Sequence, residues 1–269
     1  MTAVLEVKDV TLRFGGLVSL DAVSMSVPEG AISAVIGPNG AGKTSLFNCL
    51  TGAYRPQVGE VLFTGKDGRQ SQLVGRKPHA ITSLGVARTF QNIRLFPALT
   101  ALENVQVGVE SRQRSGALSA MLRLPSSRRD DRESVAEALR LLEFVGLRHR
   151  VHEVSASLPY GDQRRLEIAR ALGTSPTLLL LDEPAAGTNP AEKRDLEGLI
   201  RRVADTGVSV LLIEHDMRLV MSVASTVTVL NFGKVIASGP PESVQRDPAV
   251  VEAYLGAPGT DQTDEGTAT

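Results

Sequence analysis

The sequence predicts an α/β fold with a mainly parallel core sheet, because three short apolar runs have the composition of strands buried on both faces. These runs cover residues 31–36, 177–181 and 208–213. Strands of a parallel sheet are covered on both sides, so they are apolar throughout instead of alternating. The first run ends in a glycine-rich loop and the other two end in acidic residues or histidine, as expected where ligands bind at the carboxyl edge of such a sheet.

Length and composition are those of an ordinary globular chain. The 269 residues can bury one core with an inserted subdomain, and 42% of them are hydrophobic and 22% charged. A formal net charge of -1 gives no reason to expect a nucleic-acid partner. Cys49 is the only cysteine, so neither a disulfide nor a thiolate metal cluster can form within the chain.

The amino terminus and the hydropathy pattern favour a cytoplasmic location. Residues 1–10 lack the basic start and apolar run of a secretory signal. No stretch approaches the roughly 18 consecutive apolar residues that a spanning helix needs. We therefore expect the chain to associate with a membrane only through a partner.

The remaining elements follow in chain order. Before residue 100 the patterns indicate strands at residues 5–14, 23–27 and 59–63 and a helix at residues 44–50. Helical periodicity then dominates from about residue 100 to 172, which predicts an α-helical subdomain inserted into a domain that spans residues 1–256. Residues 257–269 carry no large apolar side chain and are predicted to form a disordered tail.

The loop after the first buried run matches the Walker A phosphate-binding pattern. Its residues are Gly37, Pro38, Asn39, Gly40, Ala41, Gly42, Lys43 and Thr44. Glycines let the backbone curl so that its N–H groups face phosphate oxygens, and the positive end of the following helix faces the same anion. We expect Lys43 to reach the β- and γ-phosphates of ATP, the Thr44 hydroxyl to bind Mg²⁺, and Ser45 to lie in the nucleotide site. A chance glycine-rich turn is the alternative, and the buried run and helix that flank the loop argue against it.

An acidic pair follows the second buried run. Asp182 and Glu183 come directly after residues 178–181, in a Walker B arrangement. The strand would deliver both residues to the carboxyl edge of the sheet. We expect Asp182 to hold Mg²⁺ and Glu183 to polarise the attacking water as general base. An acidic strand end that only faces solvent is the alternative, and the Walker A loop in the same chain favours the catalytic interpretation.

Beyond these two motifs, the sequence resembles the nucleotide-binding subunits of ABC transporters from about Leu5 to Gly256. Four further segments match in order and spacing: the Q-loop (RTFQ, 88–91), the signature motif (LPYGDQRR, 158–165), the D-loop (AGTNP, 186–190) and the H-loop (IEHD, 213–216). The resemblance implies a P-loop NTPase fold with an N-terminal antiparallel β-subdomain. It also implies ATP hydrolysis coupled to transmembrane transport.

The same resemblance implies roles for three single residues. Gln91 would touch Mg²⁺ or the attacking water, and its loop would report the bound state to the permease. Phe14 would stack on adenine. His215 would contact the γ-phosphate and hold Glu183 and its water in line. The plainer alternatives are a surface glutamine, a core phenylalanine and a structural histidine.

The signature segment implies that a second subunit completes the site. In the family the start of this helix presents N–H groups to nucleotide bound by the opposite subunit, and Gly161 keeps the glycine that close backbone approach needs. A homodimer or a heterodimer with a second ATP-binding subunit follows. The segment departs from the family pattern at Pro159, Tyr160 and Asp162, where serine, glycine and glutamine are usual. Pro159 has neither a hydroxyl nor an N–H to donate, which predicts slow hydrolysis or a partner subunit with a more typical signature. Asp162 is a candidate cap for the helix that follows.

The D-loop departs from the pattern as well. Asn189 stands where aspartate is usual, and Thr188 stands where leucine is usual. Asn189, Pro190 and Glu192 also form an ordinary helix start, with a capping residue, a proline at the first position and a glutamate two residues later. We expect this structural role to coexist with a contact across the dimer.

Several segments narrow the resemblance to the branched-chain amino acid uptake family. They are FGGL (14–17), RTFQNIRLF (88–96), YGDQRRLEIA (160–169) and AYLG (253–256). Membership of that family would imply transmembrane permease subunits as direct partners and an extracytoplasmic solute-binding protein as an indirect one. It would also imply a peripheral position on the cytoplasmic face of a bacterial membrane. Urea and other amino acid or amide importers and the lipopolysaccharide-export ATPase look similar. In that family the substrate never touches the ATP-binding subunit, so the resemblance leaves cargo and direction open.

Two other classes fit the residues less well. The first is a P-loop enzyme that acts on a soluble acceptor. A GTPase of this kind would carry an Asn-Lys-x-Asp element, which the sequence lacks, and a kinase would lack the signature helix and His215, which the sequence has. A soluble ABC ATPase of translation or DNA repair usually carries two cassettes or a long coiled-coil insertion, for which this chain is too short.

Overall fold

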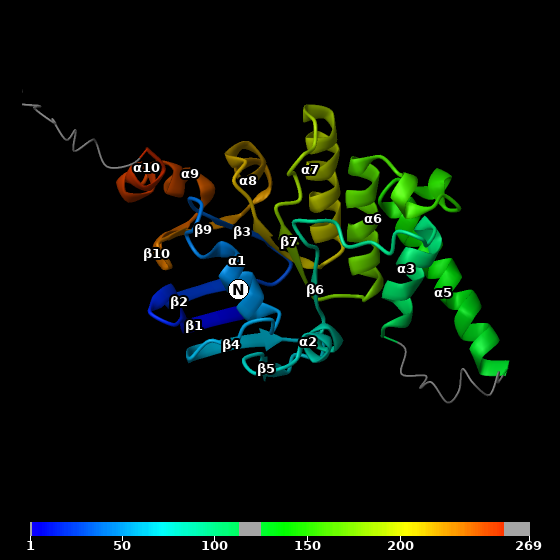
Figure 1. The fold of residues 1–269 in the computed structure, drawn as a ribbon, viewed down its shortest axis with the longest axis horizontal. Helices are drawn as coiled ribbons and strands as arrows, with labels where there is room; N and C mark the ends of the chain where they lie inside the picture. The colour runs from blue at the N-terminus through cyan, green and yellow to red at the C-terminus, as the bar shows by residue number, and fades with distance from the viewer. Residues whose placement is uncertain (1, 113–124, 256–269) are drawn as a thin grey trace, which may run out of the picture.

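The computed structural model describes residues 2–112 and 125–255, and it contains two sheets flanked by helices (Figure 1). The smaller sheet is antiparallel, in the order β2-β1-β4-β5. Its strands are β1 (Ala3–Phe14), β2 (Leu17–Pro28), β4 (Val58–Thr64) and β5 (Gln70–Gln72). This sheet is the antiparallel β-subdomain that the fold class predicts.

The larger sheet has the order β10-β9-β3-β8-β7-β6 and is parallel except at its β10 edge. Its strands are β3 (Ile32–Ile36), β6 (Val86–Arg88), β7 (Leu178–Asp182), β8 (Ser209–Ile213), β9 (Thr226–Asn231) and β10 (Lys234–Gly239). In β7, Leu179 and Leu181 pack with the helices, whereas Leu178 and Leu180 pack in the core shared with the smaller sheet. Successive strand residues face opposite sides, so β7 is buried on both faces, as its apolar run predicts.

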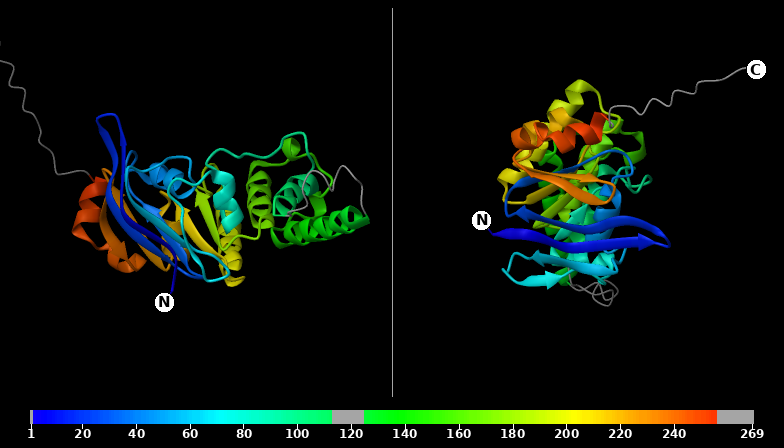
Figure 2. Two further views of the ribbon diagram at one scale, coloured as in Figure 1. Left: turned by 90° about the horizontal axis from the view of Figure 1, so that it is seen from below. Right: turned by 90° about the vertical axis from the view of Figure 1, so that its left-hand side faces the viewer.

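Helices cover both faces of the larger sheet (Figures 1 and 2). Helix α1 (Lys43–Leu50) buries Leu46, Phe47 and Leu50 between the two sheets. The opposite face carries α7 (Pro190–Asp205) and α8 (Met217–Val223), while α2 (Pro78–Leu84) contacts β6. Helices α9 (Pro241–Gln245) and α10 (Pro248–Leu255) lie at one end of the molecule. No helix in the described residues is both long and apolar enough to span a bilayer.

The helical segment between β6 and β7 projects from the other end of the molecule (Figure 2, left). It contains α3 (Ala101–Glu110), α5 (Pro125–Phe144), α6 (Tyr160–Gly173) and two short 3₁₀ turns, Arg148–Arg150 and Ser155–Ser157. Helices α3 and α6 touch backbone to backbone, since a Cβ on Gly108 would lie 2.1 Å from the Arg170 carbonyl oxygen. Because β6 and β7 are neighbours in the sheet, this segment is an insertion between two adjacent strands.

Helix starts follow local sequence in two cases and depart from expectation in a third. The predicted start at Asn189 is confirmed, because its side chain accepts from the N–H of Ala191 and Glu192 and Glu192 accepts from the Asn189 N–H. Helix α3 starts with the same device, made by Thr100 and Glu103. The prediction that Asp162 caps α6 is wrong.

Pro159 is the residue at the start of α6, and no side chain caps this helix. The Asp162 carboxylate is turned to two cations instead, 2.7 Å from Arg150 Nε and 2.5 Å from Arg165 Nη2. Ion pairing with two arginines outweighs a cap contact for this carboxylate. The predicted tail at 257–269 lies outside the described residues, so it stays a prediction.

Candidate functional site: a phosphate loop facing two carboxylates

The loop between β3 and α1 is pressed between two strands, and this packing requires glycine at two positions. A Cβ on Gly37 would lie 2.1 Å from the Leu230 carbonyl oxygen, and one on Gly42 would lie 2.7 Å from the Ser19 carbonyl oxygen. Gly42 also has a φ of 103°, which side chains rarely adopt. The loop backbone is therefore held at the start of α1, where helical N–H groups point outward.

Lys43, the first residue of α1, lies over this loop. Its Nζ donates to the carbonyl oxygens of Gly37 at 2.7 Å and Pro38 at 2.9 Å. The residue is only 8% exposed, and burial lowers the pKa of the ammonium, against the opposite pull of Glu183 and Asp182. An ammonium has three donors, so one is left for an anion in the loop. Ser45, in the same helix, accepts a hydrogen bond from Ser19 Oγ at 2.7 Å.

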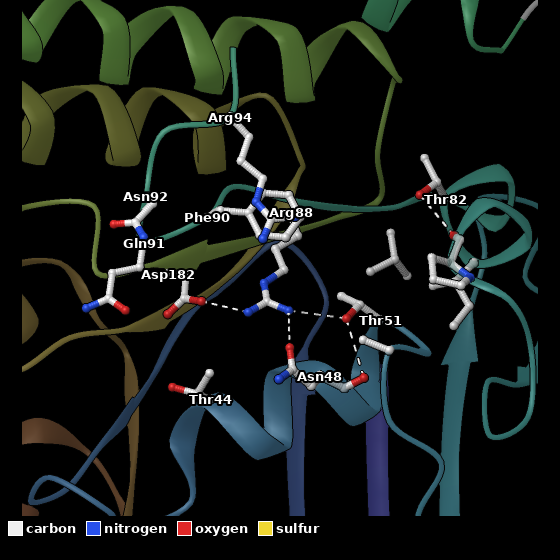
Figure 3. Close-up of a pocket in the computed structure, with 14 residues that line it drawn as sticks. Thr44, Asn48, Thr51, Thr82, Arg88, Phe90, Gln91, Asn92, Arg94 and Asp182 are labelled. Carbon is white, nitrogen blue, oxygen red and sulfur yellow. Dashed lines mark hydrogen bonds and ion pairs between the residues drawn. The ribbon is translucent and has the colours of Figure 1, made fainter. Parts of the chain in front are cut away.

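A cavity of about 570 Å³ brings the three predicted magnesium ligands together (Figure 3). Thr44 comes from α1, Gln91 from the loop after β6, and Asp182 from the carboxyl end of β7. Neighbouring strand ends thus meet at one edge of the sheet, as the sequence predicts.

Glu183 lies directly after β7 in a strained backbone conformation, with a φ of 45°. Its N–H donates to the Ile213 carbonyl oxygen at 2.9 Å, which ties it to the end of β8. Its Oε2 accepts a hydrogen bond from Gln91 Nε2 at 2.9 Å. A positive φ at a non-glycine residue is costly and is often found at functional sites. The neighbouring contacts hold the carboxylate in place despite this cost.

His215 lies near Glu183 without bonding to it. Its Nδ1 is 3.8 Å from Glu183 Oε2, beyond hydrogen-bond range, and its side chain is 62% exposed. Glu214 beside it is fully buried and was given no role by the sequence. Glu214 Oε1 accepts from the Ala185 N–H at 2.8 Å and Oε2 from the His215 N–H at 3.1 Å. These two hydrogen bonds join the loops after β7 and β8 through one carboxyl group. Burial raises the pKa of this group.

Phe14 is not a core phenylalanine, because it is 46% exposed at the tip of the β1–β2 hairpin. Its ring meets that of Tyr54 edge to face, with centroids 5.1 Å apart and planes at 76°. Phe14 does not line the cavity of Asp182. The supporting contact with Tyr54 was not foreseen, since Tyr54 is distant in sequence and carries no motif.

Gly161 is likewise placed away from the cavity. It is buried in the first turn of α6, where a Cβ would lie 2.8 Å from Glu192 Oε1. The neighbouring Tyr160 ring packs on Gly187, since a Cβ on that glycine would lie 3.3 Å from the ring. The signature segment and the D-loop of the same chain therefore touch.

Two arginines in the site were missed as functional candidates, although both stand in quoted motifs. Arg164 is 1% exposed and donates to the carbonyl oxygens of Phe90 at 2.6 Å and Gln91 at 2.7 Å. Arg88 donates to Asp182 Oδ2 at 2.7 Å. Their positions in the sequence could have indicated a role. Arg88 ends a short apolar run, and Arg164 lies within the signature helix.

Comparison with known proteins identifies the family. Residues 20–186 match the family model for the ABC transporter, and residues 234–260 match the one for the branched-chain amino acid ATP-binding cassette transporter. The chain is 45% identical over 254 residues to the high-affinity branched-chain amino acid transport ATP-binding protein BraF of Pseudomonas aeruginosa, covering 94% of this chain and 98% of that protein. It is 43% identical over 253 residues to LivG of Escherichia coli K12, a protein described in the same words, covering 94% and 97%.

Solved structures agree with this assignment. A crystal structure of an ATP-binding cassette of an ABC transporter in its ADP conformation matches with a TM-score of 0.81 and 30% identity, covering 96% of this chain and all of that one. A nucleotide-free cassette from an ABC transporter matches with the same TM-score and identity. The predicted P-loop NTPase fold and ATPase activity are confirmed. The chain is a member of the ATP-binding cassette family of ABC transporter ATPases.

Proposed function

We propose that this chain is the ATP-hydrolysing subunit of a transporter that takes up branched-chain amino acids. The observation that carries the proposal is that two family models match different parts of the chain, at residues 20–186 and 234–260. The cassette motifs match ABC transporters in general, whereas the segment at 234–260 matches the branched-chain amino acid group in particular. Curated relatives with that transport function are 43–45% identical over 94% of the chain.

The residues at the cavity fit a magnesium ion bound together with nucleotide. Thr44 offers a hydroxyl, Gln91 an amide oxygen and Asp182 a carboxylate, and all are the hard oxygen ligands that Mg²⁺ prefers. No cluster of three or more His, Cys, Asp or Glu able to hold a metal occurs among residues 2–112 and 125–255. A site with a single carboxylate, such as the one formed by Thr44, Gln91 and Asp182, is typical of Mg²⁺. This ion usually takes one or two carboxylates and completes its shell with phosphates and water. The bound ion would neutralise charge on the phosphates.

The chain's own residues would divide the hydrolytic work. Loop N–H groups and Lys43 bind the phosphates, and Phe14 offers its exposed ring to adenine. Glu183 polarises the water and Gln91 fixes the carboxylate by its 2.9 Å hydrogen bond. His215 is close enough to reach the same carboxylate through a small side-chain movement.

The proposal includes a second ATP-binding subunit, identical or not. Gly161, in the first turn of α6, would reach the nucleotide of that subunit, since it does not line the cavity of its own chain. Residues 1–256 would act as one cassette, with the helical insertion at about 100–172 facing permease subunits. The chain would then sit peripherally on the cytoplasmic face of the membrane, and a solute-binding protein would act on the far side.

Reconstitution tests the function. The chain is co-purified with its cognate permeases and second ATP-binding subunit, placed in vesicles, and supplied with the solute-binding protein and labelled leucine. ATP-dependent leucine uptake is expected, and Lys43→Ala is expected to abolish uptake while the complex still assembles. Uptake of urea but not of leucine, isoleucine or valine would replace the proposal with a related importer.

A further inference from the structure

Arg88 is an immobilised cation in the middle of the site (Figure 3). Its side chain is 8% exposed, and Nη2 donates to Asp182 Oδ2 at 2.7 Å. Its Nη1 donates to Asn48 Oδ1 at 2.7 Å and to Thr51 Oγ1 at 3.3 Å. The guanidinium also lies over the rings of Phe47 and Phe90, at 5.6 Å and 5.1 Å. The buried Nε has no hydrogen-bond partner among the described residues, so the guanidinium is held through Nη1, Nη2 and its two ring contacts.

This arrangement changes the charge that a metal ion would meet. The Asp182 side chain is 5% exposed, so solvent screens the pair weakly. An arginine stays protonated under all ordinary conditions, so its positive charge is permanent. Asp182 and Arg88 together carry no net charge, and a bare divalent cation approaching Asp182 is repelled by a guanidinium already bonded to it. The phosphates of ATP would bring the missing negative charge.

We propose that Arg88 is a positioning residue that makes the metal site conditional on nucleotide. It fixes the orientation of the Asp182 carboxylate through their 2.7 Å contact, and it suppresses binding of the bare divalent cation until phosphate oxygens arrive. The inference rests on the proposed Mg²⁺–ATP site and adds a determinant of its metal affinity. Asp182 thus stays paired in the absence of metal, which avoids leaving a buried charge without a partner.

Binding of Mn²⁺ alone tests the proposal, with free Mn²⁺ counted by electron paramagnetic resonance and no nucleotide present. Arg88→Gln is expected to bind Mn²⁺ at least about tenfold more tightly than the wild type, since the competing charge is gone. Arg88→Lys keeps the charge and is expected to stay weak. Arg94→Gln is the matched control, because Arg94 stacks on the same Phe90 ring at 4.2 Å but is exposed and bonds no carboxylate of the site.

Two further variants make the result decisive. Adding Asp182→Asn to Arg88→Gln is expected to remove the gained affinity. Asn48→Asp places a carboxylate against Arg88 Nη1 and neutralises it without removing the side chain, so this variant is also expected to bind Mn²⁺ more tightly, even if Arg88→Gln fails to fold.

The outcomes separate the inference from the function that it builds on. Folded Arg88→Gln and Asn48→Asp proteins that bind bare Mn²⁺ no better than wild type would overturn the role of Arg88. A gain that persists with Asp182→Asn would overturn it as well. Failure of the wild type to bind Mn²⁺ in the presence of ATP would instead overturn the proposed nucleotide site.

Discussion

Gln91 Nε2 donates a hydrogen bond to Glu183 Oε2 at 2.9 Å, and this bond joins two parts of the fold. The Gln91 carbonyl oxygen accepts from Arg164 of helix α6, so its backbone is fixed to the helical insertion. Its side chain reaches Glu183, directly after β7 of the core sheet. A movement of the helical insertion relative to the sheet would therefore change the surroundings of the carboxylate that is proposed to activate water.

The first prediction concerns Glu183→Gln. The amide keeps the size of the side chain and an acceptor for Gln91, but it cannot take a proton from water. We expect ATP binding to persist and kcat of the assembled complex to fall by at least about 100-fold. Single-turnover phosphate release and nucleotide binding measure the two effects, and release at the wild-type rate would mean that another group is the base.

The second prediction concerns Arg164, which bonds the Phe90 and Gln91 carbonyl oxygens and lies 3.5 Å from Glu167 Oε2. Arg164→Met frees the loop and leaves the buried Glu167 without this partner. We expect a loss of about 3–5 kcal/mol in unfolding free energy, measured by urea denaturation, together with a lower kcat.

A double variant separates position from stability for Arg164. Adding Glu167→Gln removes the buried charge that has lost Arg164 and keeps, within the described part of the chain, only Arg170 at 3.9 Å as an ion-pair partner, so part of the lost stability is expected to return. The loop stays free, so kcat is expected to remain low. A kcat that recovers together with stability would show that Arg164 only supports the fold.

The core of the fold could be predicted because its signals are local. The uniformly apolar run in β7 and the Asn189 helix start each follow from a few adjacent residues. The edge strand β6 was missed because it has only three residues, Val86–Arg88, and gains its identity from pairing with β7. Asp162 was misjudged for a similar reason, since its partner Arg150 lies 12 positions away in sequence and only folding brings them together.

The site divides in the same way. Lys43, Thr44, Asp182 and Glu183 could be proposed as site residues from the sequence alone, because motif spacing reflects the geometry of phosphate binding. Arg88 and Glu214 were not assigned roles, since their importance comes from burial against partners that are far along the chain. The pairing of Arg88 with Asp182 spans 94 positions, and nothing in the local sequence specifies it.

The third prediction is a pH dependence of stability. Burial raises the pKa of Glu214 above its ordinary value of 4.5, so the native state keeps the proton to higher pH than the unfolded chain does. The stability contributed by this group is full below that ordinary value and declines as pH rises through the raised pKa. The glutamine side chain of the Glu214→Gln variant does not titrate. The stability of this variant relative to wild type should therefore increase as pH rises.

Denaturant unfolding at a series of pH values measures this difference. Glu103→Gln is the control with the opposite sign, because hydrogen bonds from Thr100 lower the pKa of Glu103. The stability of Glu103→Gln relative to wild type should therefore decrease as pH rises over the acidic range. Parallel curves for Glu214→Gln and wild type would contradict the pH effect assigned to burial.

The fourth prediction concerns Pro159, the residue at the start of the uncapped helix α6. Pro159→Ser supplies a hydroxyl that can cap the helix and also donate to a phosphate of the opposite subunit. A hydrogen bond to a charged group is worth about 1.5–3 kcal/mol, so kcat of the complex is expected to rise roughly tenfold or more. Pro159→Ala restores the backbone N–H without adding a hydroxyl, so its kcat should lie below that of Pro159→Ser. Equal rates for the serine and alanine variants would exclude the hydroxyl as the cause, because only the added hydroxyl distinguishes the two proteins, and rates equal to wild type in both would mean that the partner subunit's signature sets the rate.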